Sequence, residues 1–240
     1  NPGVGKTAIV EELAQLLSKN KIPGLEGKRI YELDISSVVG GTKYRGEFEE
    51  KLKKIIKNVS DDGNAIIFID EIHNIIKAGG AEGAIDASNI LKPYLSRGDI
   101  QIIGATTVDE YHTIFEKDKA LNRRFQIIYV DPSNKDETLN ILNTLKPIYE
   151  DYYKLKIADN LTNYIVEVAE EFIPNMSFPD KAIDILDNSC VLAKNELTKE
   201  NINKMVEKTY NVSISKEKKA LLIKEKLEEE ILGQNNVIEK

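Results

Sequence analysis

The first residues of the chain, NPGVGKTAIV, have the types and spacing that bind phosphate. Loops that hold nucleotide phosphates follow the pattern G-x-x-x-x-G-K-S/T, and residues 1–7 supply all of it except the first glycine. Such glycines let backbone N–H groups surround phosphates at the positive end of a helix. Lys6 would then reach the β- and γ-phosphates, and the Thr7 hydroxyl would hold Mg²⁺. The alternative is a tight turn that only connects to a helix. The residues expected to contact the nucleotide are Pro2, Gly3, Val4, Gly5, Lys6, Thr7 and Ala8.

A second group that could take part in catalysis is the acidic pair that ends IIFIDE, residues 66–71. Four apolar residues followed by two acids also describe an ordinary strand that enters a loop. With a phosphate loop upstream, however, Asp70 can bind the water shell of Mg²⁺ and Glu71 can orient the attacking water. The two motifs support each other and predict an ATP–Mg²⁺ site with Glu71 as a catalytic residue.

Such a site needs a parallel sheet with helices on both faces. Apolar residues recur at helical spacing over 7–18, 47–59 and 86–97. Short β-branched segments alternate with them and predict strands at 29–35, 65–70, 100–107 and 125–130. Near-continuous apolar strands that alternate with helices are typical of an α/β fold with a buried parallel sheet. After Val130 the alternation stops, and successive helices are predicted instead.

Composition limits the classes of partner. The 240 residues include 40 acidic and 33 basic side chains, so there is no global positive field to attract nucleic acid. Cys190 is the only cysteine, so it cannot form an intrachain disulfide and is expected to fill the core. No apolar run approaches the roughly 20 residues that span a bilayer. We expect no membrane partner and a reducing compartment, either the cytoplasm or an organelle stroma or matrix, which the sequence does not distinguish.

The order GKT, FIDEIH, IGATT and ALNRRF resembles the AAA+ ATPases, and most closely the first ATPase module of the Clp unfoldases and disaggregases. The resemblance extends over nearly the whole chain, including GGTKYRGEFEEKLK, DASNILKPYLSRG, VDEYHTIFEKD and PDKAID. It implies a large α/β subdomain over 1–132, a small helical lid subdomain over 133–210, and a linker with the start of a second ATPase module over 211–240. It also implies that the central strand before the phosphate loop is missing from this sequence, which we therefore expect to be a fragment.

The resemblance assigns three further catalytic residues. Thr107 matches the sensor that hydrogen-bonds near the γ-phosphate or the attacking water, although a threonine at a strand end is also common. Arg123 and Arg124 resemble arginine fingers, which reach the ATP of the adjacent subunit and so require a ring, expected to be a hexamer. A solvated arginine pair is the alternative. The guanidinium group nevertheless suits transition-state phosphate charge.

The segment GGTKYRGE resembles the loop that projects into the central pore of Clp rings and grips an extended polypeptide. Its tyrosine lies among glycines and charges, which disfavour a core position. The residues expected to contact substrate are Lys43, Tyr44 and Arg45; a surface tyrosine is the alternative. The glycine-rich segment 77–86 resembles an accessory pore loop.

Several other residues are open to plainer interpretations. His73 matches the DE-x-H pattern of the family, but two histidines in the chain make no metal site, so a structural role is expected. Lys181, in PDKAID, lies where AAA+ proteins carry a second sensor, and a structural role is again the alternative. Asn175 and Met176 replace the usual Asp-Arg pair of the family, which puts the contact of that pair in doubt. The tyrosines of 148–156 are expected to pack between helices.

These expectations describe an ATP-hydrolysing unfoldase module that uses ATP and Mg²⁺ and acts on unfolded or tagged proteins. The long coiled-coil insertion of disaggregases is absent between LDNSC and LTKEN, which favours a module that feeds a Clp-type peptidase. The alternatives are a disaggregase whose coiled coil has been removed, a nucleic-acid remodeller of the clamp-loader or initiator type, and a scaffold that binds nucleotide without hydrolysis. Intact Glu71 and Arg123 argue against the scaffold, and the acidic balance argues against the remodeller.

Overall fold

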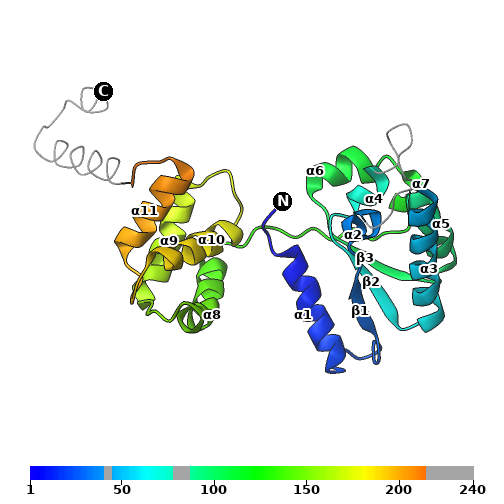
Figure 1. Ribbon diagram of the computed structural model, residues 1–240, viewed down its shortest axis with the longest axis horizontal. Coiled ribbons are helices and arrows are strands. Elements are labelled where there is room, and N and C mark those ends of the chain that lie inside the picture. Colours follow the sequence, from blue (N-terminus) through cyan, green and yellow to red (C-terminus); the bar gives the residue numbers. More distant parts are fainter. Residues whose placement is uncertain (41–44, 78–86, 215–240) are drawn as a thin grey trace, which may run out of the picture. The chain divides into compact units, whose positions relative to one another are not determined.

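The computed structural model describes residues 1–40, 45–77 and 87–214 (Figure 1). The chain divides into two compact units. The first contains Asn1 and Gly5–Val130, and the second contains Pro2–Val4 together with the described residues from Asp131 onward. Each unit has its own hydrophobic core and is described by itself below.

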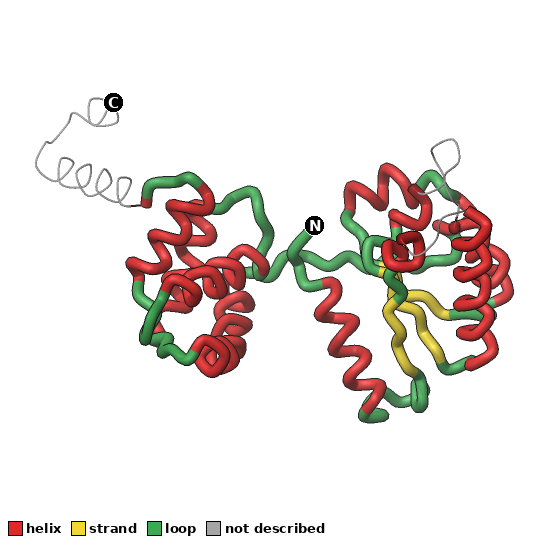
Figure 2. Tube along the Cα trace, in the orientation of Figure 1, coloured by secondary structure: helices red, strands yellow, loops and turns green. Residues whose placement is uncertain are grey.

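The first unit is built on a parallel sheet of three strands, drawn in yellow in Figure 2. The strands are β1 (Arg29–Glu32), β2 (Ala65–Ile69) and β3 (Gln101–Gly104), in the order β1-β2-β3. Ile66 is the partner of Ile30 on one side and of Gln101 on the other. All five residues of β2 are buried, as expected for the middle strand of a sheet that is covered on both faces.

Helices cover both faces of this sheet. Ile67 and Ile69 of β2 pack in one core with α3 (Arg45–Asp62) and α5 (Ala87–Arg97). Phe68, which points to the opposite face, packs with Val10 of α1 (Lys6–Ser18). Side chains of successive strand residues alternate between faces, so this division follows directly from the sequence of β2. Helices on both faces of a parallel sheet confirm the predicted α/β fold class.

Short helices follow the carboxyl ends of the strands. They are α2 (Ile35–Gly40) after β1, α4 (His73–Lys77) after β2, and α6 (Val108–Glu110) after β3. The π-helix η1 (Tyr111–Phe115) and α7 (Lys119–Asn122) complete the unit. Because the strands are parallel, the starts of α2, α4 and α6 lie at one end of the sheet, where ligands bind in open α/β folds.

The strand predicted at 125–130 is not formed. These residues have no regular structure and make no ladder with the described strands, and Ile128 is 80% exposed. Strand preference reflects packing on a pleated, half-buried surface more than an intrinsic backbone tendency. Without a neighbour to supply hydrogen bonds, the apolar pattern of FQIIYV does not by itself produce a strand.

The second unit is helical, as predicted. Between residues 131 and 214 the structure contains α8 (Lys135–Tyr153), α9 (Asp159–Phe172), α10 (Asp180–Leu192) and α11 (Lys199–Tyr210). Capping boxes start α8, with Asn134 and Glu137, and α11, with Thr198 and Asn201. A single apolar core joins the four helices through Leu142, Ile165, Leu186 and Ile202, among other residues.

Polar side chains also link these helices. Tyr153 of α8 donates a hydrogen bond to Asp187 Oδ1 at 2.8 Å, and Tyr210 of α11 donates one to Asp184 Oδ2 at 2.7 Å. Tyr149 and Tyr153 pack against the helical core, as expected, whereas Tyr152 is 77% exposed. Cys190 is buried in the core as predicted, and burial raises the pKa of its thiol to about 11.

Candidate functional site

The phosphate-loop residues lead into the first turn of α1. Gly3 and Gly5 have φ of 71° and 85°, values that a residue with a Cβ rarely adopts. Gly5 is the N-cap of α1, and it has no side chain that could accept a hydrogen bond. It therefore leaves the first N–H groups of the helix without a side-chain cap. This backbone suits a phosphate group. Lys6 donates from Nζ to the carbonyl oxygen of Asn1 at 2.7 Å, which keeps its ammonium group beside the loop.

The two chemical motifs meet through their side chains. The Thr7 hydroxyl donates to Asp70 Oδ2 at 3.0 Å, although the two residues are 63 positions apart in the sequence. Thr7 is half-buried at the start of α1, and Asp70 is exposed just after β2. A hydroxyl and a carboxylate oxygen are suitable Mg²⁺ ligands, and Mg²⁺ keeps several waters and substrate phosphates as its other ligands. The pair therefore fits the magnesium ion that the sequence predicts.

Among the described residues there is no cluster of three or more His, Cys, Asp or Glu side chains that could hold a metal ion. An all-protein metal cage is thus not formed in this part of the chain. The Thr7–Asp70 pair would instead suit an ion that takes most of its ligands from a nucleotide and water, and this role stays a prediction.

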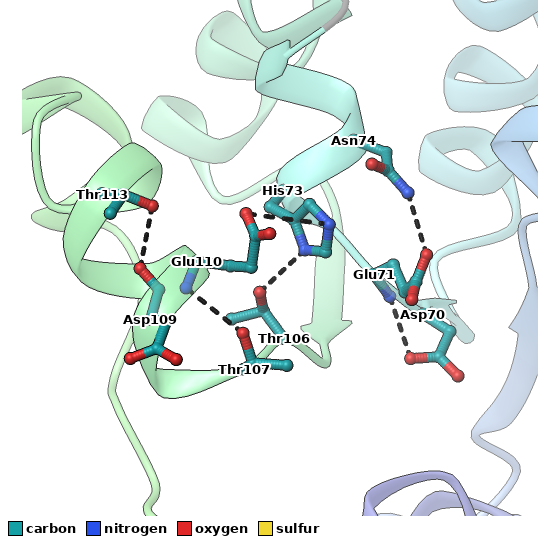
Figure 3. Close-up of polar contacts among 9 residues, drawn as sticks. All are labelled: Asp70, Glu71, His73, Asn74, Thr106, Thr107, Asp109, Glu110 and Thr113. Carbon is teal, nitrogen blue, oxygen red and sulfur yellow. Dashed lines mark hydrogen bonds and ion pairs between the residues drawn. The ribbon is translucent and has the colours of Figure 1, made fainter. Parts of the chain in front are cut away.

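The acidic pair lies on a bulge just after β2, between two backbone hydrogen bonds to Ala105. Ala105 N donates to Ile69 O at 3.0 Å, and Ile72 N donates to Ala105 O, also at 3.0 Å. Asp70 and Glu71 lie between these two bonds and are exposed, and Glu71 has φ 47°. Glu71 N donates to Asp70 Oδ1 at 2.9 Å, and Asn74 Nδ2 donates to Glu71 Oε2 at 3.1 Å (Figure 3). Both carboxylates are thereby directed by local hydrogen bonds.

Gly104 makes this close approach of the two segments possible. A Cβ at Gly104 would lie 2.6 Å from Ile72 Cδ1 and 3.0 Å from its Cγ2. Only glycine at position 104 therefore lets the Ile72 side chain cover the end of β3 while the Ile72 N–H donates to Ala105 O. The glycine of IGATT is a packing requirement of the acidic turn.

Thr107 begins the helix that follows β3. Its Oγ1 accepts a hydrogen bond from Glu110 N at 3.2 Å, so Thr107 is the N-cap of α6. The hydroxyl proton is not used in that contact and remains available for donation. Thr107 therefore has both the structural role and a geometry that permits the sensor role, which stays a prediction.

The arginine pair lies at the end of α7. Arg123 donates from Nε to Lys119 O at 3.1 Å, Arg124 donates from Nη1 to Ala120 O, and both residues are exposed. Asp118 caps this helix by accepting from Ala120 N and Leu121 N, and it pairs with Lys92 Nζ of α5 at 2.8 Å. Exposed, anchored guanidinium groups are suited to reach another molecule, and their role as fingers stays a prediction.

The predicted substrate-contacting residues fall in or beside a range that the structure does not describe. Lys43 and Tyr44 lie outside the described residues, as do residues 78–86 of the second glycine-rich segment. Arg45 is the first residue of α3, and its side chain also falls outside the description.

Lys181, the possible second sensor, is engaged within the helical unit. It is 5% exposed, donates from Nζ to Ile173 O at 2.9 Å, and lies 4.3 Å from the ring centroid of Phe178. Burial lowers the pKa of its ammonium group, and the charge of Glu170 partly opposes that effect. Ile173 is the C-cap of α9, so Lys181 stabilises a helix end.

Sequence reasoning missed several residues around the site. The sequence did not predict the hydrogen bonds of Asn74 with Glu71 and of Thr106 with His73. It also did not predict the ion pair of Lys92 with Asp118. The S/T/D/N preference at helix N-caps could have indicated Asp118, because it precedes a short helical segment. The contacts of Asn74 and Thr106 depend on the bulge geometry, for which the sequence gives no comparable signal.

The fold and site define a class of protein, namely a nucleotide-binding α/β unit accompanied by a helical unit, and comparison with known families agrees. Residues 1–132 match the ATPase family associated with various cellular activities (AAA), and residues 134–235 match the AAA lid domain. The chain belongs to the AAA ATPase family.

Relatives of this chain include Clp proteins. Over 219 residues, 90% of this chain, it is 48% identical to the "ATP-dependent Clp protease ATP-binding subunit ClpC" of Staphylococcus epidermidis. It is 49% identical, over the same share, to the "Negative regulator of genetic competence ClpC/MecB" of Bacillus subtilis. The match spans 27% of each relative's length.

Solved structures give the same result. The whole chain matches Hsp104 in its closed state with ATPγS and FITC casein, with a TM-score of 0.81 and 34% identity, over 43% of that chain. A Saccharomyces cerevisiae Hsp104–ADP complex matches with a TM-score of 0.82. The predicted resemblance to the Clp group of AAA+ ATPases is confirmed. None of the helices in the described residues is both long and apolar enough to cross a membrane.

Proposed function

We propose that this chain is the ATP-hydrolysing module of a ring-forming, hexameric Clp-type unfoldase that threads polypeptides through a central pore. The observation that carries the proposal is the Thr7–Asp70 contact, which joins the phosphate loop to the acidic strand end. Relatives named as ATP-binding subunits of Clp protease, and an Hsp104 structure with casein, support the choice of a protein substrate.

The proposed reaction is the attack of water on the γ-phosphate of ATP. Glu71, held outward by its bulge and by Asn74, orients the water and takes up its proton as the new oxygen–phosphorus bond forms and the bond to ADP breaks. Lys6 stabilises the charge on the phosphates. Thr7 and Asp70 hold Mg²⁺, which neutralises charge on the β- and γ-phosphates when bound.

Other residues complete the site from two directions. Thr107 donates its hydroxyl proton near the γ-phosphate or the water. Arg123 and Arg124 act on the ATP of a neighbouring subunit, since they lie exposed at the end of α7 and a guanidinium stabilises transition-state charge. Hydrolysis in the ring then drives Tyr44, with Lys43 and Arg45, along the threaded chain.

A peptidase partner is preferred over disaggregation. Relatives with the words Clp protease in their names are 48% identical to this chain. Only residues 193–198 connect α10 to α11, where a coiled-coil insertion would extend the helical unit.

An aromatic side chain in the pore suits a non-specific grip on many sequences, which supports threading past Tyr44.

The threading proposal can be tested by cross-linking. In the natural full-length protein with Glu71→Gln, a photo-reactive phenylalanine at position 44 should form an adduct with unfolded casein when ATP is bound. The same residue placed at Tyr152, which is 77% exposed on α8, is the matched control and should give no ATP-dependent adduct. No adduct at position 44, or equal adducts at both positions, would contradict threading.

A further inference from the structure

His73 is a buried polar residue next to the proposed catalytic glutamate, and the reaction described above does not use it. It is the first residue of α4 and is 6% exposed. The only other histidine, His112, is exposed on η1 and pairs with Glu116 at 2.9 Å. The chain therefore offers one buried and one exposed imidazole in the same unit.

Both ring nitrogens of His73 face the segment that follows β3. Nδ1 lies 2.9 Å from Thr106 Oγ1, and Nε2 lies 4.0 Å from Glu110 Oε2 (Figure 3). Between these two residues is Thr107, whose Oγ1 accepts from Glu110 N. The imidazole thus hydrogen-bonds one end of the capped turn that carries Thr107, at Thr106, and lies beside the Glu110 carboxylate at the other end.

On the other side, His73 is tied to the acidic turn. It follows Ile72 directly, and Ile72 N donates to Ala105 O in the extended ladder. The backbone bond at Ile72 and the side-chain bond at His73 are successive links between the Glu71 turn and the Thr106–Glu110 turn. Two links at adjacent positions fix both separation and rotation, which one link cannot do.

We propose that His73 is a positioning residue for ATP hydrolysis, which fixes the Thr107 hydroxyl relative to the Glu71 carboxylate through Thr106 and Glu110. The inference rests on the proposed function of Glu71 and Thr107. The Thr107 hydroxyl keeps its proton for the phosphate or the water, and the direction of that proton depends on the turn that His73 holds. Misplacement of a catalytic group by about 1 Å can cost on the order of 100-fold in rate.

A histidine that only fills the core would behave differently. Its loss would lower the free energy of unfolding and the fraction of folded protein, so nucleotide binding and turnover would fall in the same proportion. Loss of a positioning residue lowers kcat and leaves the affinity for nucleotide unchanged, because the phosphate loop does not depend on the His73 contacts. The split between kcat and Kd separates the two cases.

The experiment compares His73→Leu, His73→Asn and His112→Asn in the natural full-length protein. For His73→Leu we expect kcat to fall by about 10- to 100-fold while the Kd for ADP changes by less than about twofold. Asparagine can place an amide near the position of Nδ1, so His73→Asn should recover about half of that loss on a logarithmic scale. The exposed His112→Asn is the matched control and should leave kcat within about twofold of the wild type.

A double-mutant cycle with Thr106→Val tests the contact itself. Thr106→Val removes the same hydrogen bond, so its loss of kcat should not add to that of His73→Leu. If His73→Leu does not fold, Thr106→Val carries the test with the same expected loss of kcat and unchanged Kd for ADP. Additive losses, a parallel loss of affinity, or unchanged kcat would overturn the proposal.

The assay distinguishes this inference from the function on which it rests. If the wild type does not hydrolyse ATP, or if Glu71→Gln turns over normally, the proposed function fails. If the wild type hydrolyses ATP, Glu71→Gln does not, and the His73 variants match the wild type, only the positioning role of His73 fails.

Discussion

At the scale of single residues, the site depends on a short bulge after β2. Glu71 has φ 47°, because Asp70 and Glu71 lie between two ladder bonds that hold Ile69 and Ile72 against Ala105. The motif spacing predicted that Thr7 and Asp70 would converge, and the structure places them 3.0 Å apart. The motif spacing could not predict the hydrogen bond from Asn74 to Glu71, because that contact depends on the left-handed backbone of Glu71.

The Thr7–Asp70 contact predicts a change in magnesium dependence. Thr7→Val removes one oxygen ligand while keeping the shape of the side chain. Loss of a group that supports a metal site typically costs about 10- to 100-fold in metal affinity, so the Mg²⁺ concentration for half-maximal ATP turnover should rise by about tenfold or more. The control is Thr113→Val: Thr113 is exposed on η1, and its hydroxyl donates to the backbone oxygen of Asp109. Equal magnesium dependence in both variants would contradict the assignment of Thr7.

At the scale of elements, the apolar pattern located most of the structure. It predicted helix α1 after the phosphate loop, and helices α3 and α5 before and after β2 in the sequence. The buried strand β2 could be identified from its continuous apolar run. The apolar pattern failed at 125–130, because a strand depends on a neighbour that supplies hydrogen bonds as well as on its own residues. The role of Gly104 was also beyond the sequence, since it depends on the side chain of Ile72.

Gly104→Ala should destabilise the first unit. The added methyl would lie 2.6 Å from Ile72 Cδ1, and overpacking of this kind costs about 1–3 kcal/mol. The displacement of Ile72 would also disturb the neighbouring Glu71 turn and lower kcat. Urea denaturation measures the first effect. Gly46→Ala, where no heavy atom lies within 4 Å of the new Cβ, is the control and should be neutral or stabilising. Equal stability of the Gly104 variant and the wild type would refute the packing argument.

The helical unit should lose stability in alkali. The hydrogen bond to Asp187, assisted by burial and by the charge of that carboxylate, raises the pKa of Tyr153 to about 12. Burial and the hydrogen bond to Asp184 raise the pKa of Tyr210 in the same direction. The unfolded chain releases these protons first, near pH 10, so this contribution to stability is complete below about pH 10 and is lost as the pH rises toward about 12.

Denaturant midpoints measured from about pH 9 to about pH 12 check this dependence. Tyr153→Phe should be less stable than the wild type at neutral pH, and its stability should fall less steeply in alkali. Tyr152→Phe changes an exposed ring and should keep the steepness of the wild type. A Tyr153→Phe variant with the same alkaline decline as the wild type would show that this hydrogen bond does not link stability to pH.

At the scale of the whole molecule, the chain combines an α/β unit with a helical unit and spans about a quarter of the Clp relatives that it matches. The class of fold and the Clp resemblance were predictable, because motifs in a fixed order constrain the fold strongly. The domain limits, the arginine fingers and the pore contacts remain predictions. The arginine fingers concern neighbouring subunits, and the pore contacts concern residues outside the described part of the chain.

The central claim is that Lys6, Thr7, Asp70 and Glu71 form one site for ATP hydrolysis. The most direct test measures ATP turnover and ATP binding for Glu71→Gln in the natural full-length protein, with Glu12→Gln, an exposed acid on α1, as the control. We predict that Glu71→Gln binds ATP with the affinity of the wild type and turns over at least about 100-fold more slowly. Turnover within about twofold of the wild type would contradict the account.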